Sequence, residues 1–287
     1  MSETIVFIHG AWMTPLCWEP FSRYFQLKGY ECVAPAWPYH DQPVEELRAH
    51  PAPELAGLGV REIADHYARI ITAMDEPPIL IGHSFGGLIV QLLLDRGLGA
   101  AGVAIDSAPP RGVLPLGWTG LRANAPVLLR PGAWHQVVAL SFPAFRYAFV
   151  HTLPEDEQKA AYARQVVPES GRIFFQAALA ALRPRAPTRV NFRNRRRAPL
   201  LLVAGGQDHI VPARWNRVNY RKYRKHRATQ EGYGPAHVEF VLFRDRTHWL
   251  IADARVREVA SFVGEWLERV PRGSADDAPG APGLRRS

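Results

Sequence analysis

The sequence contains no apolar run that approaches the ~20 residues needed to cross a bilayer. Its first four residues carry neither a basic segment nor a cleavable apolar segment, so we expect no signal peptide. Cysteine is scarce: Cys17 and Cys32 are too few for a disulfide framework, and neither has metal-ligand spacing. These absences favour a cytoplasmic protein without a membrane span, and we expect neither a metal site nor a cofactor.

Acidic residues are in the minority, since 27 Asp and Glu stand against 35 Lys and Arg, for a net charge of +8. Arginine dominates, and the basic residues are densest within 183–197 and 217–227. Charge alone would allow a nucleic-acid or anionic-surface role. No nucleic-acid-binding motif accompanies either cluster, so a solvated face is the favoured interpretation and we expect no nucleic-acid partner.

One stretch of the chain places a serine between two glycines. The apolar residues 78–81 predict a strand buried on both faces, and residues 88–94 are apolar enough for a helix. Between them lies Gly-His-Ser-Phe-Gly, residues 82–86, a G-x-S-x-G pattern. A strand that turns at once into a helix strains its central residue, and the two glycines give clearance. We therefore predict that Ser84 is a nucleophile, provided that a base and an acid lie elsewhere.

A second loop follows the first predicted strand. Residues 4–8 form an apolar run that ends in His-Gly-Ala-Trp, residues 9–12. An acyl-transfer enzyme needs one backbone N–H from this loop for the developing oxyanion, and a second from the residue after the nucleophile. We assign Ala11 and Phe85 as these donors. His9 is interpreted as a structural hydrogen-bonding residue rather than the general base.

Strands and helices alternate along most of the chain. Helical patterns at 18–29 and 60–74 alternate with apolar runs at 30–35 and 101–105, while 37–59 is predicted to be loop. This order predicts an α/β fold with a doubly wound, mostly parallel sheet of about six strands.

The alternation stops after the fourth apolar run. Large apolar residues then follow helical patterns, without a convincing strand, at 137–149, 155–166 and 171–182. We predict a helical lid inserted before the acid-bearing strand. The expected divisions are an α/β core at 1–108 and 198–270, a lid at 109–197 and a disordered tail at 271–287.

Two polar side chains follow the last two predicted strands. Asp208 comes shortly after the run 199–204, and His248 comes shortly after the run 238–243. Loops at the carboxyl ends of parallel strands meet at one edge of the sheet. Ser84, Asp208 and His248 therefore form a candidate catalytic group, in the chain order nucleophile, acid, base.

Rival residues exist for the acid and the base. Asp106 follows the strand after the serine, a place where an acid would also reach the site. His209 shares a loop with Asp208, and His237 precedes its strand and so lies at the opposite end of the sheet. We favour Asp208 and His248 over these three.

Three features together resemble the α/β-hydrolase fold superfamily: the G-x-S-x-G turn at residues 82–86, the His-Gly loop at residues 9–12, and the three candidate residues. The resemblance covers 1–108 and 198–270. The His-Gly-Ala-Trp loop is similar to those of small plant-type methyl esterases, hydroxynitrile lyases and cofactor-free bromoperoxidase-type esterases. The resemblance implies that the protein is a small, esterase-like member of this superfamily with a lid.

The resemblance implies a serine hydrolase that cleaves a carboxylic ester, lactone or thioester. Two alternatives stay open: a lyase or cyclase that forms no acyl-enzyme, and a ligand-binding member without catalysis. The expected partner is a small molecule with an apolar part, and the oligomeric state is not readable. Aromatic residues are predicted to line its pocket: Trp12, Trp118, Phe142, Phe145, Phe175 and Trp249.

Overall fold

The computed structural model describes residues 3–114, 117–226 and 236–270. Six strands form one sheet in the order β2-β1-β3-β4-β7-β8, and all neighbouring strands in it are parallel. This confirms the predicted α/β fold with a doubly wound sheet. The strands are β1 (Thr4–Ile8), β2 (Glu31–Val33), β3 (Ile79–His83), β4 (Ala101–Ile105), β7 (Leu200–Gly205) and β8 (Val238–Phe243).

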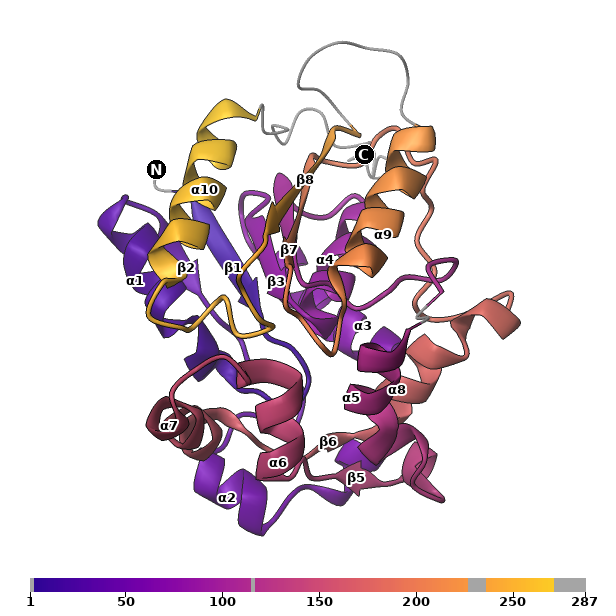
Figure 1. Ribbon diagram of the computed structural model, residues 1–287. Coiled ribbons are helices and arrows are strands. Elements are labelled where there is room, and N and C mark those ends of the chain that lie inside the picture. The colour runs from indigo at the N-terminus through magenta and orange to yellow at the C-terminus, as the bar shows by residue number, and fades with distance from the viewer. Residues whose placement is uncertain (1–2, 115–116, 227–235, 271–287) are drawn as a thin grey trace, which may run out of the picture.

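Helices cover both faces of this sheet (Figure 1). On one face α1 packs against α10, and on the other α4 lies beside α3 and α9. Every residue of β3, β4 and β7 is buried, which explains their continuously apolar sequences. The covering helices are α1 (Glu19–Leu27), α3 (Val60–Thr72), α4 (Phe85–Asp95), α9 (Ala213–Lys225) and α10 (Val256–Arg269).

The strand order reverses between β1 and β3, because the chain runs from β1 outward to β2 and then returns to the other side of β1. Such a reversal leaves a crevice at the carboxyl ends of the two strands. The loop 9–12 and Ser84 directly follow β1 and β3, so the topology brings them together there.

An insertion separates β4 from β7, and its helices lie together below the sheet in Figure 1. Its described residues, 106–114 and 117–199, form four α-helices and a π-helix, with two short 3-10 helices and a two-stranded ribbon. Its elements are α5 (Trp118–Leu128), a 3-10 helix (Ala133–His135), β5 (Val137–Val138), α6 (Phe142–Phe145), the π-helix (Arg146–Val150), α7 (Glu155–Gln165), β6 (Glu169–Ser170), α8 (Gly171–Ala178) and a 3-10 helix (Ala180–Leu182).

One local prediction in this insertion was wrong. The expected helix at 137–149 begins instead as strand β5, because Val137 and Val138 pair with Ser170 and Glu169. The Trp12 indole N–H also donates to the carbonyl of Val138. The pairing partners of β5, Glu169 and Ser170, lie beyond α6, the π-helix and α7 in the chain, and local periodicity does not register such a contact.

The predicted loop at 37–59 is also more ordered than expected. It contains α2 (Val44–Ala49) and a 3-10 helix (Pro53–Gly57), and another 3-10 helix (Pro15–Trp18) precedes α1. Val44 and Leu47 pack against Val167 of the insertion, so tertiary contact holds a helix that its sequence alone supports weakly. The predicted tail at 271–287 lies outside the described residues. Among those described, no helix is long and apolar enough to span a membrane.

Candidate active site

The turn between β3 and α4 is strained at Ser84. This residue has φ 57° and ψ −121°, a conformation that costs a non-glycine residue about 1–3 kcal/mol. A Cβ at Gly82 would lie 2.2 Å from the carbonyl oxygen of Gly86, and one at Gly86 would lie 2.0 Å from that of Ile8. Both glycines are therefore needed for the tight turn that presents the serine to the cavity described below.

The loop after β1 lies directly against this serine. A Cβ at Gly10 would lie 2.7 Å from the Cβ of Ser84. The next residue, Ala11, lines the same cavity as Ser84 and Phe85. Phe85 is the first residue of α4, where the helix dipole is positive. Ala11 and Phe85 are thus close to the serine, and their role as oxyanion donors stays a prediction.

A hydrogen-bonded carboxylate and imidazole lie at the same edge of the sheet. The Nδ1–H of His248, which follows β8, donates to Oδ2 of Asp208 at 2.5 Å. Oδ1 of Asp208 accepts the backbone N–H groups of Ile210 and Val211, both at 2.8 Å. Three donors therefore fix the carboxylate and the orientation of the ring.

The other ring nitrogen of His248 is available as a base. Because Nδ1 carries the proton, Nε2 presents a lone pair. His248 is fully buried, and no described residue forms a hydrogen bond with Nε2. A buried acceptor without a protein partner is typical of a group that acts on a substrate or a nucleophile.

His83 ties the serine turn to the histidine loop. It immediately precedes Ser84, and its Nε2–H donates to the backbone carbonyl of His248 at 2.8 Å. The two rings lie 4.3 Å apart, centroid to centroid. Complete burial, with a smaller contribution from His248, holds the pKa of His83 well below its usual value. His83 is therefore a neutral donor that joins the two loops.

Asp106 lies behind the pair as a second buried carboxyl. Its Oδ1 accepts the N–H of Gly205 at 2.7 Å, and its Oδ2 lies 3.9 Å from Nδ1 of His248. Burial and the negative charge of Asp208 raise the pKa of Asp106 well above its usual value. Asp208 is therefore the direct hydrogen-bond partner of His248, and Asp106 is a second buried carboxyl beside it whose raised pKa favours the protonated form.

The other histidines considered from the sequence have different partners. His9 donates from Nδ1 to the carbonyl of Gly10 and accepts the N–H of Trp37 at Nε2, and burial lowers its pKa to about 3. His209 donates to the carbonyl of Tyr147. His237 lies 2.8 Å from the carboxylate of Glu239, at the start of β8.

The structure also brings together a set of groups that the sequence does not associate with a metal. Among the described residues, ligand atoms of His83, Asp106 and His248 lie within 4.8 Å of one another, all buried. His83 and His248 each use one ring nitrogen in the hydrogen bonds above, and Asp106 uses one carboxyl oxygen. The raised pKa of Asp106 favours its protonated form, whereas a metal ligand would have to lose that proton.

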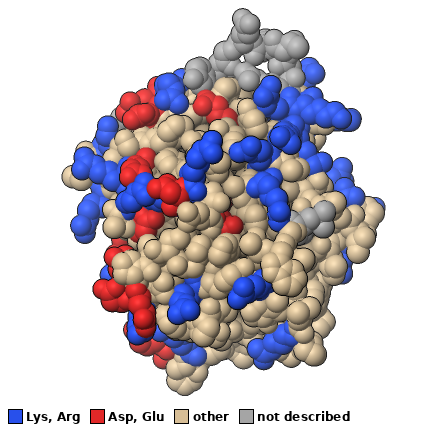
Figure 2. All heavy atoms as spheres, in the orientation of Figure 1, with Lys and Arg blue, Asp and Glu red and all other residues tan. Residues whose placement is uncertain are grey.

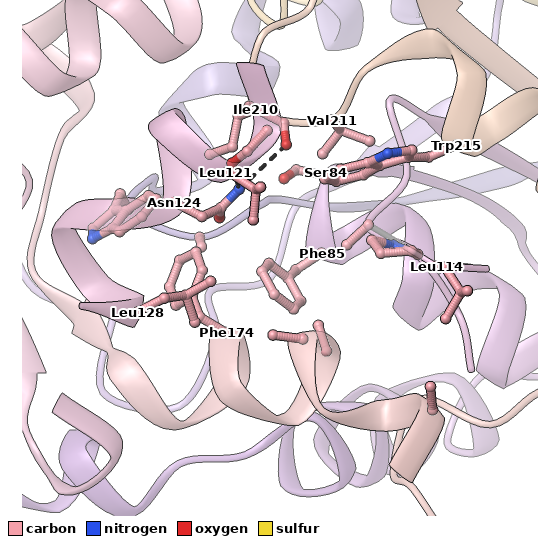
Figure 3. A pocket seen from close by; sticks show the side chains of 18 of the residues that line it. Ser84, Phe85, Leu114, Leu121, Asn124, Leu128, Phe174, Ile210, Val211 and Trp215 are labelled. Atoms are coloured by element: carbon pink, nitrogen blue, oxygen red, sulfur yellow. Dashed lines mark hydrogen bonds between the residues drawn. The ribbon is translucent and has the colours of Figure 1, made fainter. Parts of the chain in front are cut away.

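A cavity of about 370 Å³ opens beside Ser84 (Figure 3). Its walls are almost entirely apolar, and α5, α8, the 3-10 helix after α8 and the loop after β7 all contribute to them. Asn124 is a polar exception, and its amide donates to the carbonyl of Ile210 at 3.4 Å. The side chains around Ser84 in Figure 3 are Phe85, Leu114, Leu121, Leu128, Phe174, Val211 and Trp215.

The aromatic residues predicted to line the pocket are widely distributed. Trp12 lines the cavity. Trp118 is 76% exposed on the outside of α5. The remaining four pack against other aromatic rings: Phe142 on Tyr162, Phe145 on Phe149 and Trp249, and Phe175 on Trp134.

Sequence reasoning missed the aliphatic residues of α5 that form one wall. Leu121, Asn124 and Leu128 follow helical spacing and all line the cavity. That spacing was the signal that could have revealed the wall. Pro126 inside the helix and Gly120 obscured it, because both residues are typical helix breakers.

Solved structures of known hydrolases share this fold. A methylesterase from Arabidopsis is 12% identical, with a TM-score of 0.62 over 93% of this chain and 99% of that one. An extracellular α/β-hydrolase from a Paenibacillus species is 18% identical, with a TM-score of 0.64 over 92% of this chain and 98% of that one. A pyrethroid hydrolase from Sphingobium faniae is 18% identical, with a TM-score of 0.60 over 93% of this chain and 98% of that one.

At such low identity these likenesses establish the fold and not the substrate. No curated protein matches the sequence significantly. A family model, however, matches residues 5–262 and so spans the sheet, the insertion and all three candidate residues. The chain belongs to the Alpha/beta hydrolase family.

Proposed function

We propose that the protein is a serine hydrolase of carboxylic esters, with Ser84 as nucleophile, His248 as general base and Asp208 as its acid partner. The observation that carries this proposal is the 2.5 Å hydrogen bond from His248 to Asp208, which leaves Nε2 of the buried ring without a protein partner among the described residues. The strained serine adjoins a histidine that is itself bonded to the His248 loop.

In the first half of the reaction, His248 Nε2 takes the hydroxyl proton as Ser84 Oγ attacks the carbonyl carbon. The backbone N–H groups of Ala11 and Phe85 receive the oxyanion, and each such donor is worth about 3 kcal/mol of barrier. The imidazolium then returns its proton to the leaving alkoxide, and the alcohol departs from an acyl-serine.

In the second half, a water molecule replaces the alcohol. His248 takes its proton, the hydroxide attacks the acyl carbon, and the proton returns to Ser84 as the acid product leaves. Asp208 holds the ring in the Nδ1–H tautomer and stabilises the imidazolium without taking its proton. Ser84, His248, Asp208, the two backbone N–H groups and water account for every proton transfer and stabilise every charge in these steps. This chemistry therefore calls for no cofactor.

The walls of the cavity favour a substrate with an apolar part. Leucine, alanine and aromatic side chains dominate the lining, and among the described lining residues the polar side-chain groups besides Ser84 are the Asn124 amide and the indole N–H groups of Trp12 and Trp215. A small ester would place its carbonyl at Ser84 and its apolar group between α5 and α8. The esterases and hydrolases among the structural neighbours support the same reaction class.

Replacement of Ser84 tests the proposal directly. Ser84→Ala should lose turnover of a p-nitrophenyl ester while keeping the circular dichroism spectrum of the parent. Ser141→Ala, at an exposed serine before α6, is the matched control and should keep full turnover. Near-parental turnover by Ser84→Ala would refute the nucleophile.

Rapid mixing separates hydrolysis from the alternatives on this fold. A burst of p-nitrophenol equal to the enzyme concentration indicates an acyl-enzyme and therefore hydrolysis through Ser84. A lyase or cyclase would form no such intermediate, and a binding protein would hold the ester without turnover.

A further inference from the structure

Large apolar side chains are exposed at the cavity and at the two ends of the helix α5 that forms one of its walls. Leu114, Leu121 and Leu182 line it, yet they are 52%, 52% and 78% exposed. Trp118 and Leu129, at the two ends of α5, are 76% and 79% exposed. We call these five residues the apolar rim. Most side chains of this kind are buried in a folded domain, so their concentration in this part of the molecule requires an explanation.

The outer face of α5 presents part of this rim as a stripe. Trp118, Leu121 and Leu129 lie at helical spacings that put them on the same side of the helix. Arg122 lies on that side as well, and its guanidinium stacks over the ring of Tyr147 at 4.2 Å. This outward face of α5 therefore carries large apolar side chains and a cation side by side.

Further cations border the rim. The guanidinium of Arg214 packs directly against Gly117, the residue before Trp118, and Lys222 lies against Gly112. Arg183 follows Leu182, and Arg111 donates to the carbonyl of Arg183 at 2.9 Å. Together with Arg122 we call these the border cations. Among the ion pairs formed by the described residues, none includes a border cation.

The chain segments around the rim carry many positive charges and almost no negative ones. Residues 107–154, 170–207 and 209–226 contain no Asp or Glu but hold 18 of the 35 Lys and Arg. Figure 2 shows blue side chains spread over the side of the molecule where α9 lies, whereas red ones gather on the opposite side. A surface that combines this charge with exposed leucine and tryptophan fits an anionic apolar partner.

We propose that the apolar rim and its border cations dock on an anionic lipid surface. The cations would contact the headgroups while Trp118, Leu129 and Leu182 enter the interfacial region. A second copy of the chain fits poorly, because a two-fold contact would oppose the cations of one copy to those of the other. A nucleic acid would pair with the cations but would leave the leucines without an apolar partner.

Docking in this orientation would open the cavity toward the lipid. Apolar molecules concentrate in a bilayer, and the rim leucines continue into the cavity lining that leads to Ser84. The docking itself does not depend on catalysis, whereas its use in substrate supply rests on the proposed hydrolase function.

Vesicle sedimentation tests the docking without reference to turnover. We would use the full-length Ser84→Ala protein with vesicles of phosphatidylcholine alone, or of phosphatidylcholine with phosphatidylglycerol. The protein should bind the anionic vesicles at low salt, bind the neutral ones much more weakly, and lose affinity as salt rises. Equal binding to both compositions, or to neither, would refute the proposal.

Leucine variants on the two sides of the molecule provide the matched comparison. Leu129→Ser or Leu182→Ser should weaken binding to the anionic vesicles about tenfold or more, because each removes one buried leucine from the contact. Leu27, on α1, is 85% exposed and away from the rim, so Leu27→Ser should not change binding. Equal effects of all three substitutions would contradict the assigned face.

Charge variants distinguish lipid from other polyanions. The double variant Arg122→Gln/Arg214→Gln should bind vesicles more weakly than the control double variant Arg23→Gln/Arg269→Gln. The control changes two exposed arginines, one on α1 and one on α10. If the protein binds duplex DNA as tightly as the vesicles, and Leu129→Ser leaves both affinities unchanged, a polyanion site without an apolar component is indicated and the lipid proposal is wrong.

Discussion

The substitution Asp106→Asn tests whether the second carboxyl of the site is neutral. In the folded protein Asp106 Oδ1 accepts a backbone N–H, while no described donor reaches Oδ2. An ionised Asp106 would therefore leave a buried anionic oxygen unsatisfied, which is costly. As an acid it keeps its proton, in keeping with its raised pKa. An asparagine retains the accepting oxygen and replaces the hydroxyl with an amide donor of similar size.

The distance between Asp106 and His248 sets the size of the effect. A full negative charge 3.9 Å from Nδ1 would stabilise a protonated imidazole by about 4 kcal/mol at an effective dielectric constant of about 20. That energy corresponds to about 3 pH units. If Asp106 were ionised, Asp106→Asn would move the acid limb of the kcat/KM profile toward lower pH by a large part of this amount. If Asp106 is neutral, the limb should move by less than about 0.5 unit.

The assay is the pH dependence of kcat/KM for a p-nitrophenyl ester, measured for the parent and for Asp106→Asn. A shift of the acid limb by more than about one unit toward low pH would refute the neutral assignment. The neighbouring titratable groups are Asp208 and His83, and neither is altered by the substitution. A loss of activity at all pH values without a shift would indicate a distorted site instead.

Stability gives a second readout of the same assignment. An Asp whose pKa is raised on folding contributes its full stability below its ordinary value of 3.8, and loses it as the pH rises through the folded value. Asparagine does not titrate, so Asp106→Asn should be more stable than the parent at neutral pH. Urea unfolding at several pH values should show this advantage shrinking as the pH falls toward 3.8.

Two further substitutions probe the remaining parts of the site. Asp208→Asn should lower kcat by about 10⁴-fold with little change in KM, because the tautomer of His248 is no longer fixed, and a loss below about tenfold in steady-state assays would contradict the role of Asp208. Gly86→Ala should prevent soluble folding, since its Cβ would lie 2.0 Å from the carbonyl of Ile8, whereas Gly57→Ala, with no atom within 4 Å of the new Cβ, should purify like the parent. Normal thermal unfolding of Gly86→Ala would show that the turn tolerates a side chain.

The sequence was sufficient for the sheet because each strand carries its own signal. The strands before Ser84 and Asp208 are short, fully buried and, apart from His83, apolar, as buried parallel strands are. Once their order was known, the chain position of Ser84, Asp208 and His248 placed all three at one edge. The hydrogen bond between the last two follows from that topology.

The cavity was harder to predict because its walls depend on side-chain direction in the insertion. Phe145 and Phe149 lie four residues apart, yet Phe149 lines the cavity and Phe145 packs behind it on Trp249. The two rings stack on one face with their centroids 5.1 Å apart, so helical spacing does not tell which of them reaches the cavity. The exposure of the rim leucines could likewise not be predicted, since an apolar residue in a sequence is expected to be buried.

Burial also explains why the rival residues of the site do not compete with the chosen pair. Burial lowers the pKa of His9 and of His83, so both rings are neutral. Each ring donates its N–H to a backbone carbonyl. Burial and the charge of Asp208 raise the pKa of Asp106 and so favour its neutral form. A low-dielectric pocket with several titratable groups would otherwise hold several competing proton arrangements. The Asp208 carboxylate and the His248 imidazole remain as the hydrogen-bonded pair that we propose to act on Ser84.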